Sequence, residues 1–396
     1  MKKIILIIID GLGDEKIPQL GNQTPLEKAR TPHLDFLASQ GTCGLVESWH
    51  QKGKKPTSED CHLALFGYPP QKSNPGRGVL EALGVGMEIL ANDVCLRGNF
   101  ATINEKNFKI IDRRAGRIEK TERLIESINN LEIKGIRFLI AKAFSHRIVV
   151  LMRGKGLSAQ ISDGDPKRVG VRPYLIKPLS QTKSAIFTAN VLNQFLRKAH
   201  FILKDHPQNK KRKLPANYIL VRGAGKFRKI KSFSQRYNLR SAFIAGGTLY
   251  KGIARYLGMK EIKVRGANGL PNTNLRGKIL ALKKNLKNYD FIFCHIKAPD
   301  NLAEDGNFLG KKRFIEKFDK SLKPLLGLKN CLVVITGDHS TCSLLKSHCG
   351  FPSPILVWGK EKDGVERFSE KDCKKGALGR FKQIKLMPKI IEMAKN

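Results

Sequence analysis

The sequence predicts an α/β fold in which helices flank a central, mostly parallel sheet that is interrupted by an inserted α+β domain. Three short apolar runs, at residues 4–9, 291–296 and 332–336, each end at or shortly before a carboxylate, and such runs are typical of buried parallel strands. From about residue 78 to 235, short β-like runs instead alternate with Gly, Asn and Asp turns and many arginines.

The domain boundaries follow from this change of pattern. We expect a discontinuous core of residues 1–77 and 236–396 and an inserted domain of residues 78–235. A chain of 396 residues is longer than one compact domain usually grows, which agrees with two domains.

Composition excludes a membrane-spanning or disordered chain. The sequence is 41% hydrophobic and 7% aromatic, and no apolar run reaches the length that a bilayer requires. The run at residues 4–9 follows two lysines, as in a signal peptide, but it is too short and ends at Asp10. We therefore interpret it as a buried strand.

The 8 cysteines form no CxxC pair, and several lie within apolar segments. Because a chain of this length can build a real core, we expect no disulfide framework and a reducing, cytoplasmic setting.

The formal net charge of +39 would attract nucleic acid, anionic membranes or phosphorylated metabolites. Lysine and arginine are spread along the chain, although residues 204–213 and 222–231 are dense in them. No zinc finger, aromatic-basic strand signature or glycine-arginine tract accompanies the charge. The pattern favours a solvated basic surface over a specific nucleic-acid site, and it leaves the oligomeric state open.

One helix is expected within residues 31–41. Thr31 can cap this helix, Pro32 can be its first residue and Gly41 can follow its end. Residues 248–257 and 311–322 carry further helical patterns.

Three carboxylates, Asp10, Asp300 and Asp338, follow the three predicted strands. Ligands of open α/β sheets bind beyond the carboxyl ends of the strands, so these acids are expected to share one site. Asp338 and His339 are adjacent, and His348 lies nine residues further on; mixed Asp and His ligation suits Mn²⁺ and Zn²⁺. A zinc cluster that includes Cys342 and Cys349 is an alternative, but their spacing matches no standard structural site.

Ser58 stands at the start of a predicted helix that Gly67 closes. The free amide groups and positive dipole end there would bind a phosphate and favour a serine alkoxide. The alternative is that Ser58 or Thr57 only caps the helix.

Taken together, Asp10-Gly11, Ser58 with Gly67-Tyr68, Asp300, Asp338-His339 and His348 occur in the order of the alkaline phosphatase superfamily. The sequence resembles the archaeal-type cofactor-independent (2,3-bisphosphoglycerate-independent) phosphoglycerate mutases of that superfamily. The resemblance covers nearly the whole chain and includes the segments 76–84, 97–102, 112–117, 162–166, 222–225 and 244–247. It implies an alkaline phosphatase-like sheet with a cap domain.

The resemblance also implies a dinuclear metal site. One ion would be held by Asp10, Ser58, Asp338 and His339, and the other by Asp300, Glu304 and His348. The sequence departs from the family at Glu304, where histidine is usual, at Pro299, where threonine is usual, and at Thr57 and Glu59, which replace glycine and aspartate. Glutamate still offers oxygen to a hard ion, with a shift toward Mn²⁺ or Mg²⁺, but its charge would weaken attraction for an anionic substrate.

The implied activity is an isomerase reaction of glycolysis and gluconeogenesis that interconverts 3-phosphoglycerate and 2-phosphoglycerate through a phosphoserine at Ser58. Two divalent ions would be required, Mn²⁺ first and Zn²⁺, Mg²⁺ or Co²⁺ as alternatives, and no 2,3-bisphosphoglycerate. By resemblance the substrate contacts are Arg97, Asp112, Arg113, Arg114, His146 and Arg147. The competing hypotheses are a metal-dependent phosphatase or other phosphotransferase with the same site, and a catalytically impaired homologue that binds nucleic acid through its basic surface.

Overall fold

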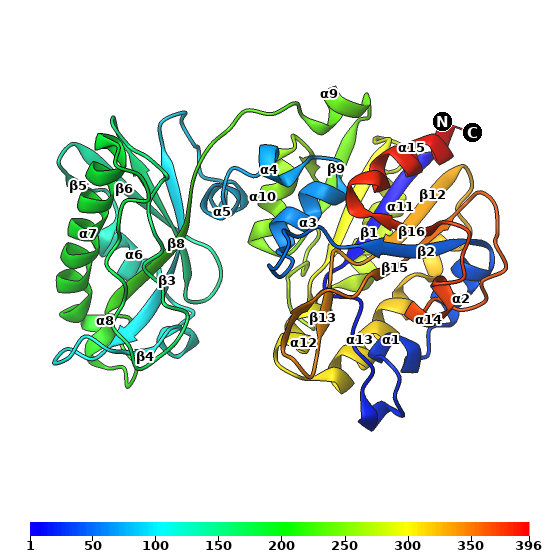
Figure 1. Cartoon of the computed structure of the whole chain (residues 1–396), viewed down its shortest axis with the longest axis horizontal. Coiled ribbons are helices and arrows are strands. Elements are labelled where there is room, and N and C mark those ends of the chain that lie inside the picture. Colours follow the sequence, from blue (N-terminus) through cyan, green and yellow to red (C-terminus); the bar gives the residue numbers. More distant parts are fainter. Residues whose placement is uncertain (396) are drawn as a thin grey trace. The chain divides into compact units, whose positions relative to one another are not determined.

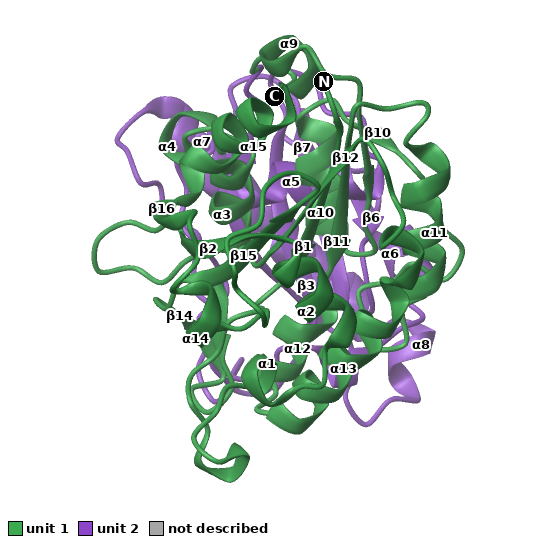
Figure 2. Cartoon of the chain, turned by 90° about the vertical axis from the view of Figure 1, so that its right-hand side faces the viewer, with its two compact units in different colours: residues 1–74, 230–396 green, residues 75–229 purple. Residues whose placement is uncertain are grey.

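The computed structural model describes residues 1–395 and divides the chain into two compact units, shown in Figures 1 and 2. Unit 1 contains Met1–Asn74 and the chain from Ile230 onward, and unit 2 contains Pro75–Lys229. The boundaries expected after residues 77 and 235 thus fall a few residues beyond those of the units.

The sheet of unit 1 has 8 strands and is parallel except for β15, which runs antiparallel to both of its neighbours. Its strands, in spatial order, are β10 (Lys260–Glu261), β9 (Ser241–Ile244), β11 (Phe291–Ile296), β1 (Lys3–Ile9), β12 (Cys331–Thr336), β15 (Ser353–Trp358), β2 (Gly41–Glu47) and β16 (Gly379–Lys382). The three strands expected from sequence are therefore adjacent at the centre, and the mostly parallel α/β class is confirmed.

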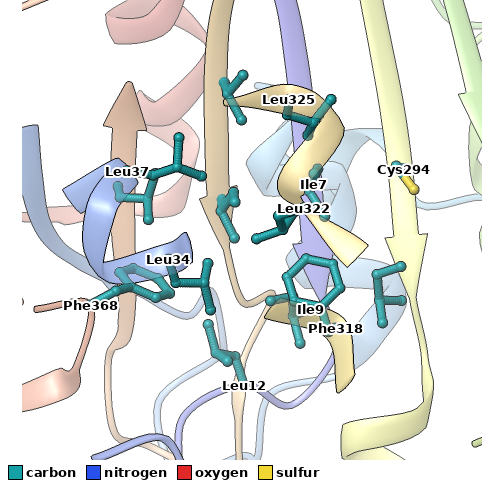
Figure 3. Close-up of a cluster of buried hydrophobic side chains, with 14 of the residues drawn as sticks. Ile7, Ile9, Leu12, Leu34, Leu37, Cys294, Phe318, Leu322, Leu325 and Phe368 are labelled. Atoms are coloured by element: carbon teal, nitrogen blue, oxygen red, sulfur yellow. The ribbon is translucent and has the colours of Figure 1, made fainter. Parts of the chain in front are cut away.

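Side chains alternate between the two faces of this sheet. On one face Ile7 and Ile9 of β1 lie in the apolar cluster of Figure 3, which includes Leu34, Leu37 and Phe318. Helices α2 (Pro32–Ser39), α11 (Leu275–Asn285) and α13 (Phe308–Ser321) are among those that contribute to this cluster. On the other face Phe293 of β11 packs edge-on against Phe66, which follows α3 (Ser58–Leu65), at a centroid distance of 5.0 Å.

The predicted helices form, with two corrections at their ends. Pro32 opens α2 and Gly41 follows its end as expected, but Thr31, at the cap position, makes no capping hydrogen bond. Helix α13 begins at Phe308, earlier than expected, because the Asn307 side chain accepts a hydrogen bond from the Gly310 amide at 2.8 Å. Helix α10 (Thr248–Tyr256) matches the pattern expected from residue 248.

Unit 2 is built on a 6-stranded antiparallel sheet. Its strands are β3 (Val94–Ile103), β4 (Ile110–Asp112), β5 (Leu131–Ile133), β6 (Ile136–Lys142), β7 (Arg147–Arg153) and β8 (Tyr218–Lys226). Helix α5 (Arg77–Val85) packs on one face, and α7 (Lys183–Lys204), which lies in another apolar cluster with α6 (Glu122–Ile128), packs on the opposite face. Helix α7 was not expected from sequence, although Thr182 caps it and Leu192, Phe195 and Leu196 lie on its buried side.

No helix within residues 1–395 combines the length and apolarity needed to cross a bilayer.

The expectation of free thiols is wrong at one pair. Strands β13 (Ser340–Cys342) and β14 (Ser347–Cys349) form a hairpin, and a disulfide joins Cys342 to Cys349 with a Cα–Cα distance of 5.9 Å. The turn between the strands folds the two residues together although 7 positions separate them, which their sequence spacing did not reveal. Since both sulfurs are bonded, this pair offers no thiolates for a zinc cluster. The remaining cysteines are free and buried.

Candidate metal centre

Two carboxylates come together because β1 and β12 are parallel neighbours in register, with Ile8 opposite Thr336. Asp10 follows β1 directly, and Asp338 follows β12 after one glycine. The turn after β1 leaves no room for a side chain at Gly11, whose φ is 65° and where a Cβ would lie 2.6 Å from Thr341 Oγ1. The Gly11 amide donates to Asp338 Oδ1 at 3.2 Å, which fixes that carboxylate.

Ser58 is the first residue of α3 and not its cap. The cap is Thr57, whose side chain accepts from the Asp60 amide. The Ser58 hydroxyl is thereby released from capping, and its Oγ lies 3.3 Å from His339 Nε2 in a site where Ser58 is only 5% exposed. One turn later, buried His62 donates its Nδ1 hydrogen to the Ser58 carbonyl oxygen at 2.8 Å, which holds the first turn of α3.

A first group of ligand atoms includes His339, the residue whose Nε2 lies 3.3 Å from the Ser58 hydroxyl. Those of Asp10, Asp338 and His339 lie within 4.8 Å of one another. His339 Nε2 is 3.4 Å from Asp10 Oδ1 and 3.3 Å from Asp338 Oδ2. Both carboxylate oxygens are buried and have no hydrogen-bond partner, a costly arrangement for an anion that a bound cation would relieve. The donor set therefore fits a divalent cation.

A second group of ligand atoms joins Asp300, His339 and His348, again within 4.8 Å of one another. Asp300 lies on α12 (Ala298–Glu304) and is buried, and His348 Nε2 is 3.4 Å from its Oδ1. Glu304 follows one helical turn after Asp300, but its side chain is 52% exposed and its Oε1 is 3.8 Å from His348 Nε2. Glu304 thus stands at the rim of this group, within reach of an ion and outside the tight cluster.

Hydrogen bonds orient both imidazoles with Nε2 toward the ligand groups. His348 Nδ1 lies 2.8 Å from the Pro56 carbonyl oxygen and must donate to it. Thr341 donates its only hydroxyl hydrogen to Asp300 Oδ1 at 2.6 Å, so it accepts from His339 Nδ1 at 3.2 Å. In each ring the Nε2 lone pair is left for a metal ion, as outer-shell partners commonly arrange.

Three functional residues were missed by sequence reasoning, and all three face Asp10 Oδ2. The Tyr250 hydroxyl donates to this oxygen, His295 Nε2 lies 3.4 Å from it, and Lys297 Nζ lies 3.0 Å from it. His295 and Lys297 stand at the end of β11 just before Asp300, so a signal existed for them. None existed for Tyr250, which packing alone brings to the site.

Burial and neighbouring charges displace the pKa values of these groups. Burial would raise the pKa of Asp10, but attraction by Lys297 and the His295 ring nitrogen 3.4 Å away hold it well below its usual value. Burial, followed by repulsion from Asp10 and Asp300, raises the pKa of Asp338 well above its usual range. Burial lowers the pKa of His339 to about 3, so the ring is neutral and able to ligate. The centre thus holds more buried carboxylate groups than fixed positive charges, and a divalent cation would balance this excess.

The substrate residues expected in unit 2 gather around β3 and β7. Arg97 and Arg147 lie on these paired strands, and Arg97 is 6% exposed with its Nε 4.0 Å from Glu81. Burial, then repulsion from Arg77, lowers the pKa of Arg97. Buried Arg97 and exposed Arg147 thus bring two guanidinium groups onto one pair of strands, a grouping that suits an anion.

The other expected contacts in unit 2 have varied surroundings. Arg113 binds Asp165 through two hydrogen bonds of 3.0 and 2.7 Å, and Asp112 accepts from the Arg114 amide. Burial, followed by repulsion from Arg147 and Arg114, lowers the pKa of His146 to about 3. Arg222, 3.9 Å from Asp165, was missed.

Comparison with known proteins agrees with this architecture. The sequence model of the 2,3-bisphosphoglycerate-independent phosphoglycerate mutase family matches residues 38–209. The 2,3-bisphosphoglycerate-independent phosphoglycerate mutase 1 of Methanocaldococcus jannaschii is 42% identical over an alignment of 402 residues, which covers 99% of this chain and 97% of the relative. That of Archaeoglobus fulgidus is 42% identical over 97% of this chain and 96% of the relative.

Solved structures lead to the same family. The cofactor-independent phosphoglycerate mutase of Thermoplasma acidophilum superimposes with a TM-score of 0.71 at 35% identity, over 100% of both chains. A Pyrococcus horikoshii protein gives a TM-score of 0.85 at 30% identity, over 100% of this chain and 97% of its own. With this identity along its whole length, and with its residues at the strand ends, the chain belongs to the 2,3-bisphosphoglycerate-independent phosphoglycerate mutases.

Proposed function

We propose that this chain interconverts 3-phosphoglycerate and 2-phosphoglycerate through a phosphoserine on Ser58, with two divalent cations and without 2,3-bisphosphoglycerate. The observation that supports this most directly is the Ser58 hydroxyl 3.3 Å from His339 Nε2, beside the unpartnered oxygens of Asp10 and Asp338. Family membership supports the same reaction. We place it in the glycolytic and gluconeogenic metabolism of the cytoplasm.

We assign the cations to the two ligand groups, extended by Ser58 and Glu304 as the resemblance to the family implies. The first ion would take Asp10, Ser58, Asp338 and His339, and the second would take Asp300, Glu304 and His348. Oxygen-rich ligation with a rim glutamate favours Mn²⁺, while Zn²⁺, Mg²⁺ and Co²⁺ stay candidates. Bound cations would lower the pKa of the serine hydroxyl and polarise the phosphoryl group.

The remaining chemistry belongs to the protein and its substrate. Ser58 Oγ attacks the phosphorus of 3-phosphoglycerate, the bond from phosphorus to the substrate oxygen breaks, and glycerate remains bound. The 2-hydroxyl of glycerate then attacks the phosphoserine, which releases Ser58 and forms 2-phosphoglycerate. Retention of glycerate and exclusion of water distinguish this outcome from hydrolysis.

We assign the substrate anion to the arginines of unit 2. Guanidinium groups bind carboxylate and phosphate in a bidentate manner, and Arg97, Arg113, Arg114 and Arg147 with His146 and Asp112 are our candidates. The burial of Arg97 and His146, and the repulsion of each by neighbouring arginines, support an anion as the partner.

The test is a mutase assay on purified protein with Mn²⁺ and 3-phosphoglycerate, together with metal analysis. We expect 2-phosphoglycerate from wild type, none from Ser58→Ala, and equal or greater activity from Glu304→His. Ser39→Ala, which removes a hydroxyl bonded only to the α2 backbone of unit 1, is the matched control and should remain active. An active Ser58→Ala protein would exclude the mechanism.

Two other outcomes would replace the proposal. Free phosphate without 2-phosphoglycerate would identify a phosphatase. Salt-dependent RNA or DNA binding, with neither phosphoserine nor bound metal, would identify an impaired homologue with a nucleic-acid partner.

A further inference from the structure

Lys297 connects the two ligand groups. It caps α12 directly after β11, and its Nζ lies 3.0 Å from Asp10 Oδ2 and forms an ion pair with Asp300 Oδ2. Asp10 belongs to the first group and Asp300 to the second, so one ammonium group touches both. Its side chain is 19% exposed, and the Tyr250 ring lies 5.5 Å from Nζ. Lys297 is therefore confined inside the centre.

A charge at this position acts in opposite directions on cations and anions. An ammonium group repels a divalent ion held by the same carboxylates, and it competes for their oxygens; it attracts a phosphorylated substrate. These effects are strong because the surrounding groups are buried.

The negative charge of Glu304 determines whether the centre needs the positive charge of Lys297. When ionised, Asp10, Asp300, Glu304 and Asp338 each carry one negative charge, so two divalent ions would only balance them. While the Ser58 hydroxyl keeps its proton, Lys297 then provides the one positive charge left over. With an uncharged histidine at position 304, that surplus would exist without any lysine.

We propose that Lys297 is a built-in third cation of the centre, which offsets the Glu304 carboxylate, weakens binding of the divalent ions and draws the anionic substrate. Only the claim that Lys297 draws the substrate rests on the mutase function proposed above. The claim that Lys297 weakens binding of the divalent ions depends on the two ligand groups alone.

The first experiment is calorimetric titration of metal-free protein with Mn²⁺. Lys297→Met keeps the length and apolar stem of the side chain but removes its charge, so we expect a Kd for Mn²⁺ about tenfold or more below that of wild type. Lys297→Arg keeps the charge and should stay near wild type. Lys312→Met, which breaks an ion pair with Glu316 on α13, is the matched control and should change nothing.

The second experiment measures anions on the Mn²⁺-loaded proteins. We expect Lys297→Met to raise the KM for 3-phosphoglycerate and the Kd for inorganic phosphate by about tenfold or more. The double variant Lys297→Met/Glu304→His has the same formal charge as wild type, so it should recover most of the loss. Phosphate binding tests the effect of Lys297 on anions even if wild type shows no mutase activity. Failure of this inference can therefore be distinguished from failure of the proposed mutase function.

Three results would overturn the inference. They are weaker Mn²⁺ binding by Lys297→Met, unchanged phosphate affinity in that variant, and absence of recovery in the double variant. Weaker Mn²⁺ binding would show that Lys297 only supports the ligands. Should Lys297→Met not fold, by circular dichroism, Lys297→Gln keeps a polar end beside both carboxylates and allows the same comparison.

Discussion

Tyr250 offers a sharp test of how Asp10 is oriented. Its ring stacks on His295 at a centroid distance of 3.5 Å, and its hydroxyl donates to Asp10 Oδ2. The other oxygen, Oδ1, is buried and unpartnered beside His339. Gly247 makes room for this ring, since a Cβ there would lie 2.8 Å from Tyr250 Cδ2. We infer that Tyr250 holds one oxygen so that the other faces the metal.

Tyr250→Phe should weaken metal binding while the fold persists. The substitution removes only the hydroxyl, and the ring contacts with His295 remain. A hydrogen bond to a buried charged group contributes about 1.5–3 kcal/mol, and loss of an outer-shell partner lowers metal affinity about 10–100-fold. We therefore expect the Kd for Mn²⁺ to rise by about tenfold or more. This is opposite in sign to Lys297→Met, although both side chains contact the same oxygen.

The assay is Mn²⁺ titration of metal-free protein, followed by thermal unfolding with and without Mn²⁺. Tyr68→Phe is the matched control, because its hydroxyl is also partly buried but donates to the Lys231 carbonyl oxygen at 3.0 Å. An unchanged Kd in Tyr250→Phe, or an equal rise in Tyr68→Phe, would refute the orienting role.

Three further predictions concern the scaffold. Lys311→Met should destabilise unit 1 by about 3–5 kcal/mol in thermal or urea unfolding, because it leaves fully buried Asp14 unpaired. Burial raises the pKa of Glu370 to about 7, so wild type should lose stability as pH rises from about 4.5 to 7, and Glu370→Gln should abolish that slope in urea titrations. Cys342→Ser should weaken Mn²⁺ binding severalfold by loosening the hairpin that carries His348, and reductant should do the same to wild type.

The centre of the fold was predictable because it depends on short-range patterns. Apolar runs at residues 4–9, 291–296 and 332–336 indicated strands, and parallel strands end at one edge of a sheet, so the following acids had to meet. Asp10 and Asp338 could be selected on that ground.

The surroundings of the site were not predictable, because they depend on contacts between distant segments. Tyr250 reaches Asp10 from 240 residues away, and Thr341 orients His339 only when the hairpin folds back. Helix α7 was missed because turn residues and arginines on either side of it dominated the pattern. Ser58 and Thr57 were equal candidates as caps until the backbone showed which one accepts from Asp60.

The two ends of unit 2 meet at a pair of glycines. Gly76 and Gly225 approach so closely that a Cβ on Gly76 would lie 2.7 Å from Gly225 Cα. Only a few residues separate these glycines from Asn74 and Ile230, where unit 1 stops and resumes. Unit 2 is therefore an inserted domain whose two ends adjoin each other. A short linker between residues 74 and 230 could replace unit 2 without any change in the strand order of the unit 1 sheet, and a different domain could be inserted at the same point.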